Sequence, residues 1–295
     1  MKVLIAGATG FVGSNLVSEL AAAGHDIVVF ARPGSNFYGP QASGIKTIMA
    51  DPSKSLEIIL DGVEAVINSI GIIREFPSKE ITFKKVHIDI TRNLVDSAVK
   101  NKIPRFLQIS ALGVNSDGKT GYQISKYKAE QLIINSSLVY TIFRPSMLFG
   151  PGDKSINFFA DLIKRLPLVP VIGDGQYRLQ PLFIEDLCRA LAASLKRPDF
   201  NHKIVELGGP DIFTYDSMLD TLGAAMGRKS VPKIHLPVSP MRLAACLLGG
   251  FKSFPLSNEQ ITMLLEENFV ERGSFETQFG FAPARLSDTI RNYIK

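Results

Sequence analysis

The stretch Lys2-Val-Leu-Ile-Ala-Gly-Ala-Thr-Gly-Phe-Val-Gly13 decides the fold of this chain. It sets a short, β-branched run of strand character directly before three glycines spaced three residues apart, Gly7, Gly10 and Gly13. The residues that follow, 14–23, have the apolar spacing of an amphipathic helix. Strand, glycine turn and helix in this order predict a dinucleotide-binding loop. A flexible glycine turn is the alternative interpretation.

Each glycine has its own physical role in such a loop. Gly7 permits a tight, positive-φ exit from the strand, and Gly10 lets backbone N–H groups approach a pyrophosphate. Gly13 lets the helix pack closely on the sheet, with the positive end of its dipole toward the phosphates. The loop residues that complete the expected phosphate site are Thr9, Phe11 and Val12. The side chains of the last two are expected to pack the helix while their backbone N–H groups face phosphate.

The composition is that of a folded globular protein. Its 295 residues suffice for one large α/β domain or two smaller ones. A hydrophobic content of 45% with 21% charged residues excludes a disordered chain. The net charge of +5 comes from scattered residues, with no basic stripe interleaved with aromatics. We therefore expect no nucleic-acid partner.

Cysteine, histidine and the apolar runs exclude other classes. The four histidines lack metal-ligand spacing, so no metal site is expected, and Cys188 and Cys246 are expected to be buried free thiols. The apolar N-terminal run is broken by glycines, which argues against a signal peptide. The longest apolar stretch, Leu243–Phe251, is too short to span a bilayer. These features predict a cytoplasmic, or organelle-interior, protein without a transmembrane segment.

Short apolar runs alternate with helical patterns through the first half. The candidate strands are Val3–Ala6, Ile27–Phe30, Thr47–Met49, Ala65–Asn68, Arg105–Ile109 and Val139–Phe143. The candidate helices are Val12–Ala23, Leu56–Leu60, Phe83–Lys100 and Tyr122–Asn135. Near-continuous β-branched strands separated by helices predict a parallel sheet covered on both faces. The expected fold class is α/β, a Rossmann-type doubly wound sheet.

The pattern loosens after Phe149. A helix at Ile156–Leu166, a second at Ile184–Leu195 and a strand at Ile204–Leu207 are still recognisable. Proline- and glycine-rich connections follow from Gly208 onward. We expect residues 1–150, completed by roughly 181–208, to form the dinucleotide-binding Rossmann domain. Residues 151–180 and 209–295 then form a smaller substrate or lid region.

The residue that ends the second strand indicates the cofactor. An acidic residue there binds the ribose 2′-hydroxyl of NAD, whereas arginine accommodates the 2′-phosphate of NADP. This chain reads Ile27-Val-Val-Phe-Ala-Arg32, and Asp26 lies before the strand, on the wrong side to reach the ribose. Arg32 therefore predicts NADP(H), with NAD less favoured. A solvated surface arginine is the alternative.

Two further strand ends point toward the cofactor. Asp51 follows the third strand, where it could accept a hydrogen bond from the adenine amino group or cap the next helix, and both interpretations stay open. The fourth strand ends in Asn68-Ser-Ile-Gly71. We expect Ser69 and Gly71 to lie beside the cofactor, with the glycine allowing a close approach.

Tyr122-Gln-Ile-Ser-Lys126 opens the helix after the fifth strand. Residues four apart share a helix face, so Tyr122 and Lys126 are expected to point together. A nearby ammonium lowers the pKa of tyrosine, which would make Tyr122 an acid/base for hydride-transfer chemistry. Lys126 could also bind the nicotinamide ribose. An ordinary surface helix is the alternative.

These motifs together resemble the short-chain dehydrogenase/reductase superfamily, in its extended and atypical branches. The matching segments are Gly7–Gly13, Tyr122–Lys126 with Ala129-Glu130, Phe143–Ser146 and Phe149–Gly152. The resemblance covers essentially the whole chain. It implies a catalytic set of Tyr122, Lys126 and the strand-end Ser110. It also implies that the Arg144-Pro145 segment runs past the nicotinamide, which makes Pro145 a cofactor-binding residue.

Two departures point to an atypical subfamily. Extended members place a hydroxyl where this chain has Leu112, and an asparagine where it has His87. Both details, and the stretch 255–268, are similar to the subfamily that includes the nucleotide-binding accessory subunit of respiratory complex I. That resemblance implies bound NADPH with a role in structure or assembly. His87 itself is expected to be a packed histidine, with a proton shuttle as the alternative.

Three functions remain open at this point. The first is an NADP-dependent oxidoreductase or epimerase acting on a hydroxyl or carbonyl carbon. The second is a non-catalytic NADPH-binding factor of a larger redox complex, with Leu243–Phe251 and the C-terminal helices as contact surface. The third is a regulator that senses the NADPH/NADP ratio. No residue pattern identifies a substrate, and Arg178 and Gln180 are expected to anchor a loop or to face substrate. The resemblance also allows a homodimer formed through the helices at 83–100 and 122–135.

Overall fold

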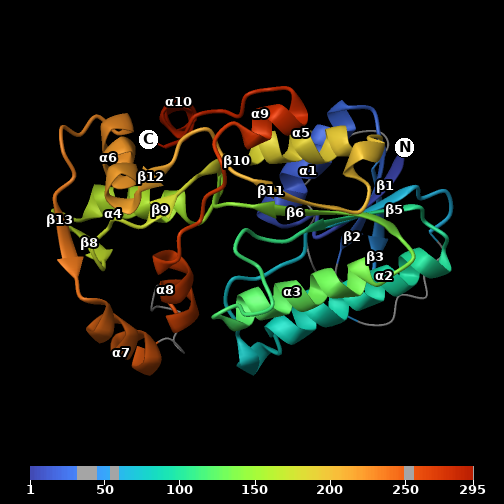
Figure 1. Ribbon diagram of the computed structural model, residues 1–295, viewed down its shortest axis with the longest axis horizontal. Coiled ribbons are helices and arrows are strands. Elements are labelled where there is room, and N and C mark those ends of the chain that lie inside the picture. The colour runs from blue at the N-terminus through green and yellow to red at the C-terminus, as the bar shows by residue number, and fades with distance from the viewer. Residues whose placement is uncertain (32–44, 54–59, 249–255, 295) are drawn as a thin grey trace. The chain divides into compact units, whose positions relative to one another are not determined.

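The computed structural model describes residues 1–31, 45–53, 60–248 and 256–294. The chain divides into two compact units, each of which is described by itself (Figure 1). Unit 1 comprises Met1–Pro145 and Glu185–Glu206, and unit 2 comprises Ser146–Ile184 and Leu207–Lys295. Arg32 and most of the helix expected at 56–60 lie outside the described residues.

A seven-stranded sheet in the order β11-β6-β5-β4-β1-β2-β3 organises unit 1. Its strands are β1 (Lys2–Ala6), β2 (Asp26–Ala31), β3 (Ile45–Met49), β4 (Ala65–Asn68), β5 (Arg105–Ile109), β6 (Val139–Pro145) and β11 (Lys203–Leu207). The five pairs among β1 to β6 are all parallel. This arrangement confirms the predicted α/β doubly wound sheet. The strand order reverses between β1 and β4, which is where such sheets bind ligands beyond the carboxyl ends of their strands.

The central strands are buried along their whole length. Every residue of β4 and of β5 is buried, as expected for strands covered on both faces. The register aligns Ala6 of β1 with Asn68 of β4, and Asn68 with Gln108 of β5. The carboxyl ends of these three strands therefore lie side by side.

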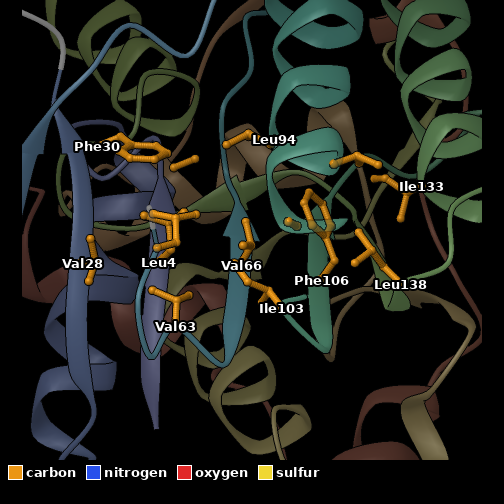
Figure 2. Close-up of a cluster of buried hydrophobic side chains, with 14 of the residues drawn as sticks. Leu4, Val28, Phe30, Val63, Val66, Leu94, Ile103, Phe106, Ile133 and Leu138 are labelled. Atoms are coloured by element: carbon orange, nitrogen blue, oxygen red, sulfur yellow. The ribbon is translucent and has the colours of Figure 1, made fainter. Parts of the chain in front are cut away.

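Helices cover both faces of the unit 1 sheet. They are α1 (Phe11–Ala22), α2 (Ile90–Lys100), α3 (Gly121–Ile134) and α5 (Ile184–Ser194). Figure 1 shows α2 and α3 side by side on one face, with α1 and α5 on the other. Between the sheet and α2/α3 lies a hydrophobic cluster in which Phe106 and Val66 meet Leu94 and Ile133 (Figure 2). Removal of this apolar surface from water is the main force that holds the layer together.

One helix differs from its prediction. The pattern at 83–100 reads as a single helix, but the structure has a π-helix, η2 (Lys84–Asp89), which continues directly into α2. A π-helix keeps helical dihedrals and changes only the spacing of its hydrogen bonds, so apolar periodicity does not reveal it. This wider turn carries His87, which is buried.

Unit 2 combines short helices with two-stranded pairs. The helices are α4 (Ile156–Arg165), α6 (Tyr215–Ala225), α7 (Val238–Leu248), α8 (Asn258–Leu265), α9 (Ser274–Phe279) and α10 (Leu286–Thr289). The pairs join β7 (Leu148–Phe149) to β10 (Leu182–Phe183), β9 (Arg178–Leu179) to β12 (Phe213–Thr214), and β8 (Val169–Ile172) to β13 (Lys233–Leu236). The described residues also include the 3₁₀ turns η1 (Pro77–Lys79) and η3 (Pro198–Phe200) of unit 1 and η4 (Ile290–Asn292) of unit 2. The short strands of unit 2 carry no clear periodic pattern, and the sequence did not predict them.

The cysteine prediction is wrong for one of the two thiols. Cys188 is buried, but Cys246 is exposed on α7. Ala245 faces a small apolar cluster with Ile172 and Ile261, and the next residue around the helix turns away from that cluster. Within the described residues, no helix is both long and apolar enough to cross a membrane.

Candidate functional site

The glycine turn has the geometry that its sequence predicts. Gly7 leaves β1 with a φ of +91°, a conformation that side-chain-bearing residues rarely adopt. The Gly10 amide donates to the Gly7 carbonyl at 2.9 Å, and Gly10 is the N-cap of α1. A Cβ on Gly13 would collide with the Gly7 carbonyl oxygen. No side chain caps α1 among the residues described, so its N-terminal amides are available to an anion.

Ser69, the first residue after β4, lies directly against Gly7 of this turn. Its backbone amide and its hydroxyl both donate to the Ala6 carbonyl, at 2.9 and 2.8 Å. A Cβ on Gly7 would lie 2.7 Å from the Ser69 hydroxyl oxygen. Ser69, which the sequence predicts to lie beside the cofactor, therefore links the end of β4 to the end of β1. Its hydroxyl leaves no room for a side chain at position 7, where the chain has glycine.

A pair of buried amides joins the ends of β4 and β5. The Asn68 side chain donates to Thr91 at 3.1 Å and to Gln108 at 2.9 Å, and accepts from the Ile70 amide at 3.1 Å. Gln108 in turn donates to the Ile109 carbonyl at 3.0 Å. These bonds fix the backbone on which the remaining site residues stand.

Lys126 reaches the same strand end from α3. Its side chain is only 5% exposed, and its ammonium donates to the Ile109 carbonyl at 3.0 Å. Burial lowers the pKa of Lys126 from 10.5 to about 8, against a smaller raising effect of the Glu130 charge. A Cβ on Gly71 would lie 3.1 Å from the ammonium nitrogen. The glycine after β4 thus leaves the space that Lys126 occupies.

Glu130 lies one helical turn beyond Lys126 and is fully buried. Arg144 of β6 pairs with both of its carboxylate oxygens, at 3.0 and 2.6 Å, and also reaches Glu206 at 3.3 Å. A buried carboxylate needs such a partner, because its desolvation is costly. The pair anchors α3 to the sheet on the side of Lys126.

His87 is buried between the loop after β4 and α3. Its Nε2 accepts a hydrogen bond from the Ile72 amide at 3.1 Å, and its Nδ1 lies 2.8 Å from the Ser125 hydroxyl. Burial, with the charge of Lys126, lowers the pKa of His87 to about 2, so the ring is neutral. Both ring nitrogens are engaged, which fits the packed histidine expected from the sequence.

Tyr122 is the second residue of α3. The helix begins with a capping box in which the side chains and amides of Thr120 and Gln123 bond reciprocally. Burial raises the pKa of Tyr122 to about 12, whereas the sequence predicted a pKa lowered by Lys126. That prediction is wrong in direction, because spacing on a helix does not reveal how far a phenol is desolvated. At neutral pH Tyr122 therefore carries its proton and can act as a donor.

Ser110 directly follows Ile109 at the end of β5. Its side chain is 4% exposed, and within the described part of the chain its hydroxyl has no hydrogen-bond partner. Its backbone amide donates to the Phe143 carbonyl at 2.7 Å. An unpaired buried hydroxyl costs about 1–3 kcal/mol. It is suited to bind a ligand oxygen beside the strand end that holds Lys126.

Other predicted site residues make contacts of their own. Asp51 accepts from the amide and the hydroxyl of Ser53, at 3.0 and 2.8 Å, as a turn-capping carboxylate does. Pro145 is buried at the end of β6, and its carbonyl accepts the Leu112 amide at 2.9 Å. Thr9 is exposed on the glycine turn, while Phe11 and Val12 are partly buried in the first turn of α1.

Several contributing groups were missed from the sequence. Asn68 bonds Gln108 across two strands, Gln108 bonds the neighbouring Ile109 carbonyl, and that carbonyl accepts from Lys126 on α3, so these groups meet mainly through contacts between segments that are distant in sequence. Ser125 had a local signal, since it lies three residues after Tyr122 on the same helix face. In the described ranges no three histidine, cysteine, aspartate or glutamate side chains are grouped as a metal site would require.

Comparisons with known proteins agree with this fold. Residues 3–208 match the NAD dependent epimerase/dehydratase family. Over 277 residues the chain is 29% identical to mitochondrial NADH dehydrogenase (ubiquinone) 1 alpha subcomplex subunit 9 of Arabidopsis thaliana, covering 89% of this chain and 67% of that protein. It is 27% identical over 256 residues to ceramide reductase of Caulobacter vibrioides, covering 85% and 78%.

Solved structures show the same fold. The UDP-glucuronic acid 4-epimerase of Bacillus cereus, in complex with UDP-glucuronic acid and NAD, superposes with a TM-score of 0.73 at 20% identity. The superposition covers 100% of this chain and 99% of that chain. At this identity the likeness bears on the fold alone.

Proposed function

The chain belongs to the NAD dependent epimerase/dehydratase family, and from that premise we propose that it is an NADP(H)-dependent oxidoreductase or epimerase acting on a hydroxyl or carbonyl carbon. The observation that carries this proposal is the group at the end of β5. There a buried lysine bonds the strand end next to a buried hydroxyl that has no partner among the described residues, and a tyrosine that keeps its proton lies one turn earlier on the helix that carries the lysine. All three come from the segments that the family motif assigns to catalysis.

Different residues of unit 1 would bind the cofactor and transfer the proton. The first turn of α1, from Phe11 to Gly13, would present its backbone amides to the pyrophosphate, the glycines of the preceding turn would leave room for the close approach, and Lys126 would hold the nicotinamide ribose. The cofactor, when bound, supplies or accepts a hydride. Ser110 would donate its hydroxyl hydrogen to the substrate oxygen, and Tyr122 would give its phenolic proton to that oxygen during reduction. Oxidation would reverse the proton movement.

The preference for NADP(H) rests on Arg32. In the sequence Arg32 directly follows Ala31, the last residue of β2, and an arginine at that position would supply the charge that a 2′-phosphate needs; Asp26 is the first residue of β2, at its opposite end. Arg32→Glu should weaken NADPH binding far more than NADH binding in a calorimetric titration. Equal losses for the two cofactors would remove this part of the proposal.

The activity is tested in two steps. Mass spectrometry of ligands released from the purified chain should identify a nicotinamide dinucleotide. NADPH oxidation across a panel of carbonyl compounds and quinones should then show turnover that Tyr122→Phe abolishes. Ser110→Ala should reduce the turnover while NADPH affinity stays unchanged, since the serine is assigned to the substrate oxygen. A turnover rate equal in Tyr122→Phe and wild type would contradict the assignment.

A second candidate is a non-catalytic, NADPH-holding factor of a redox complex. Two observations favour it: the relative named as an NADH dehydrogenase subunit, and the apolar face of α7, where Leu243 and Leu247 are 62% and 69% exposed. Residues four apart share a helix face, so the two leucines form one patch. Bound NADPH that survives purification and is not oxidised by any compound of the panel would favour this candidate. A cytoplasmic location and a homodimer remain predictions.

A further inference from the structure

His87 connects three segments of the candidate site. It sits on the π-helix η2, bonds the loop after β4 through Ile72, and bonds α3 through Ser125. The Cβ position of Gly71 lies 3.7 Å from His87 Nε2 and 3.1 Å from the Lys126 nitrogen. His87 and Lys126 therefore approach the same short stretch of backbone.

The hydrogen bonds of His87 run in one direction. A backbone amide can only donate, so the Ile72 N–H fixes Nε2 as the acceptor. A neutral imidazole then carries its proton on Nδ1 and donates it to the Ser125 oxygen. The Ser125 hydroxyl in turn donates to the Tyr122 carbonyl at 2.8 Å. The chain of bonds ends on the backbone of the predicted acid.

Ring packing reinforces this chain. The His87 ring stacks on Phe83 at 5.3 Å and meets the Tyr122 ring edge-on at 5.5 Å. Phe83 itself contacts the Tyr122 ring edge-on at 6.0 Å. Edge-to-face contacts of this kind are favourable and directional. The phenol ring of Tyr122 is thus held by two rings from the η2 segment.

The π-helix gives His87 its position. Such wide turns are uncommon and are found mostly at functional sites. Here the turn is anchored at its start, where the Phe83 amide donates to Glu75 at 2.6 Å. Four residues further on, the same turn carries His87, which reaches Ile72 and Ser125 from one ring.

We infer that His87 is a positioning residue: as the Nδ1–H tautomer it holds the first turn of α3, and with it Tyr122, against the backbone at Gly71–Ile72. This arrangement argues against a proton shuttle, because the partner of Nε2 is a backbone amide, which neither supplies nor takes up a proton. The inference rests on the proposed function, since positioning matters when Tyr122 transfers a proton. The expected consequence is on the orientation of Tyr122 rather than on cofactor affinity.

Four variants separate the two bonds from the ring packing. His87→Asn retains a donor near the Nδ1 position, and His87→Gln retains an acceptor near the Nε2 position. His87→Phe keeps the ring and loses both bonds, and Ser125→Ala removes the link to Tyr122. His235→Phe is the matched control, because that histidine is exposed in unit 2 and pairs with Asp216.

The first measurement is the nitrogen NMR spectrum of the four histidines in the full chain. One histidine should show a protonated Nδ1 and an unprotonated Nε2, should not titrate between pH 5 and 8, and should vanish in His87→Phe. An Nε2–H tautomer, or an imidazolium at pH 6, would overturn the inference. This result does not depend on whether the protein is an enzyme.

The second measurement follows the Tyr122 ring by carbon NMR, with its signal assigned through Tyr122→Phe. We expect the signal to shift or broaden in His87→Phe and Ser125→Ala, to recover partly in His87→Asn, and to stay unchanged in His235→Phe. Where the panel reveals turnover, kcat should fall about tenfold or more in His87→Phe with an unchanged KM for NADPH. An unaltered Tyr122 signal in Ser125→Ala would overturn the positioning role even if His87→Phe fails to fold.

Discussion

Lys126 carries the charge that the site depends on, in a place where water hardly reaches it. Its ammonium has the Ile109 carbonyl as a partner, and Glu130, the nearest carboxylate along the helix, is already paired with Arg144. The remaining cost of burial appears as the lowered pKa, about 8. Near neutral pH the amine is thus poised to lose its proton more readily than an exposed lysine.

This shift predicts how stability depends on pH. Below pH 8 Lys126 is charged in both the folded and the unfolded chain, and its burial costs stability. Between pH 8 and 10.5 the folded chain releases the proton while the unfolded chain keeps it, so the free energy of unfolding rises with pH. The gain reaches about 3 kcal/mol. Lys126→Met lacks this gain. The free energy of unfolding of the wild type minus that of Lys126→Met, measured by denaturant unfolding, should therefore rise across this pH range.

That comparison has an internal control. Other groups that titrate in the same range are present in both proteins, and their effects cancel in the difference. A stability difference between wild type and Lys126→Met that stays constant from pH 7 to 10.5 would contradict the buried, pKa-shifted lysine.

At the scale of single residues, the sequence predicted which residues to consider for the site better than it predicted their burial and hydrogen bonds. The spacing of Tyr122 and Lys126 on one helix was enough to place them together as candidates. It could not show that the lysine would bind the Ile109 carbonyl, because β5 and α3 are brought together only by folding. It also gave the wrong direction for the pKa of Tyr122, which burial raises.

Among the elements, the glycine turn and α1 form the part on which the proposed cofactor binding depends. Gly13→Ala would place a methyl group against the Gly7 carbonyl and force α1 away from the turn. We expect a loss of about 1–3 kcal/mol in the free energy of unfolding. NADPH affinity should fall at least tenfold, because the helix amides lose their alignment with the phosphates. Thermal unfolding and calorimetric titration measure the two effects.

Gly24→Ala is the matched control for this variant. Gly24 follows α1 with a φ of +73° and has nothing within 4 Å of its Cβ position. Alanine there costs about 1–2 kcal/mol of backbone strain. Its NADPH affinity should stay that of the wild type. If the two variants weaken NADPH binding equally, the effect is general destabilisation and the glycine turn is not the phosphate site.

Helices and strands could be predicted where their burial requires a run of apolar residues that is recognisable in the sequence. The runs at β1, β4 and β5 are mostly apolar, with polar residues at or near their ends, because both faces of the sheet are covered. The π-helix and the two-residue strands of unit 2 carry no such pattern. Pairing partners far along the chain, as between β9 and β12, decide them instead.

At the scale of the whole molecule, one buried side-chain amide, that of Gln180, connects distant segments of unit 2. Gln180 donates to the Gly209 carbonyl and accepts from the Val270 amide, both at 2.7 Å. Nearby, Arg178 pairs with Glu267. The sequence left open whether Gln180 and Arg178 anchor a loop or face substrate, and both side chains make anchoring contacts. Three distant stretches of chain therefore meet at one residue.

Gln180→Leu should destabilise unit 2 strongly. The substitution leaves the Gly209 carbonyl and the Val270 amide without their partner, and each unpaired buried group costs about 1–3 kcal/mol. Gln176→Leu is the control, because Gln176 is exposed and bonds only locally to Asp174. Its effect should stay within about 0.5 kcal/mol. Denaturant unfolding that finds equal stabilities for the two variants would contradict the anchoring role.

We propose that this chain holds NADP(H) at the turn between β1 and α1. The most direct test is a calorimetric titration of NADPH into the full-length chain freed of bound nucleotide. We predict saturable binding at one site per chain, tighter for NADPH than for NADH, and at least tenfold weaker in Gly13→Ala. No binding of NADPH, NADP, NADH or NAD up to about 1 mM, an affinity of roughly −4 kcal/mol, would contradict the account.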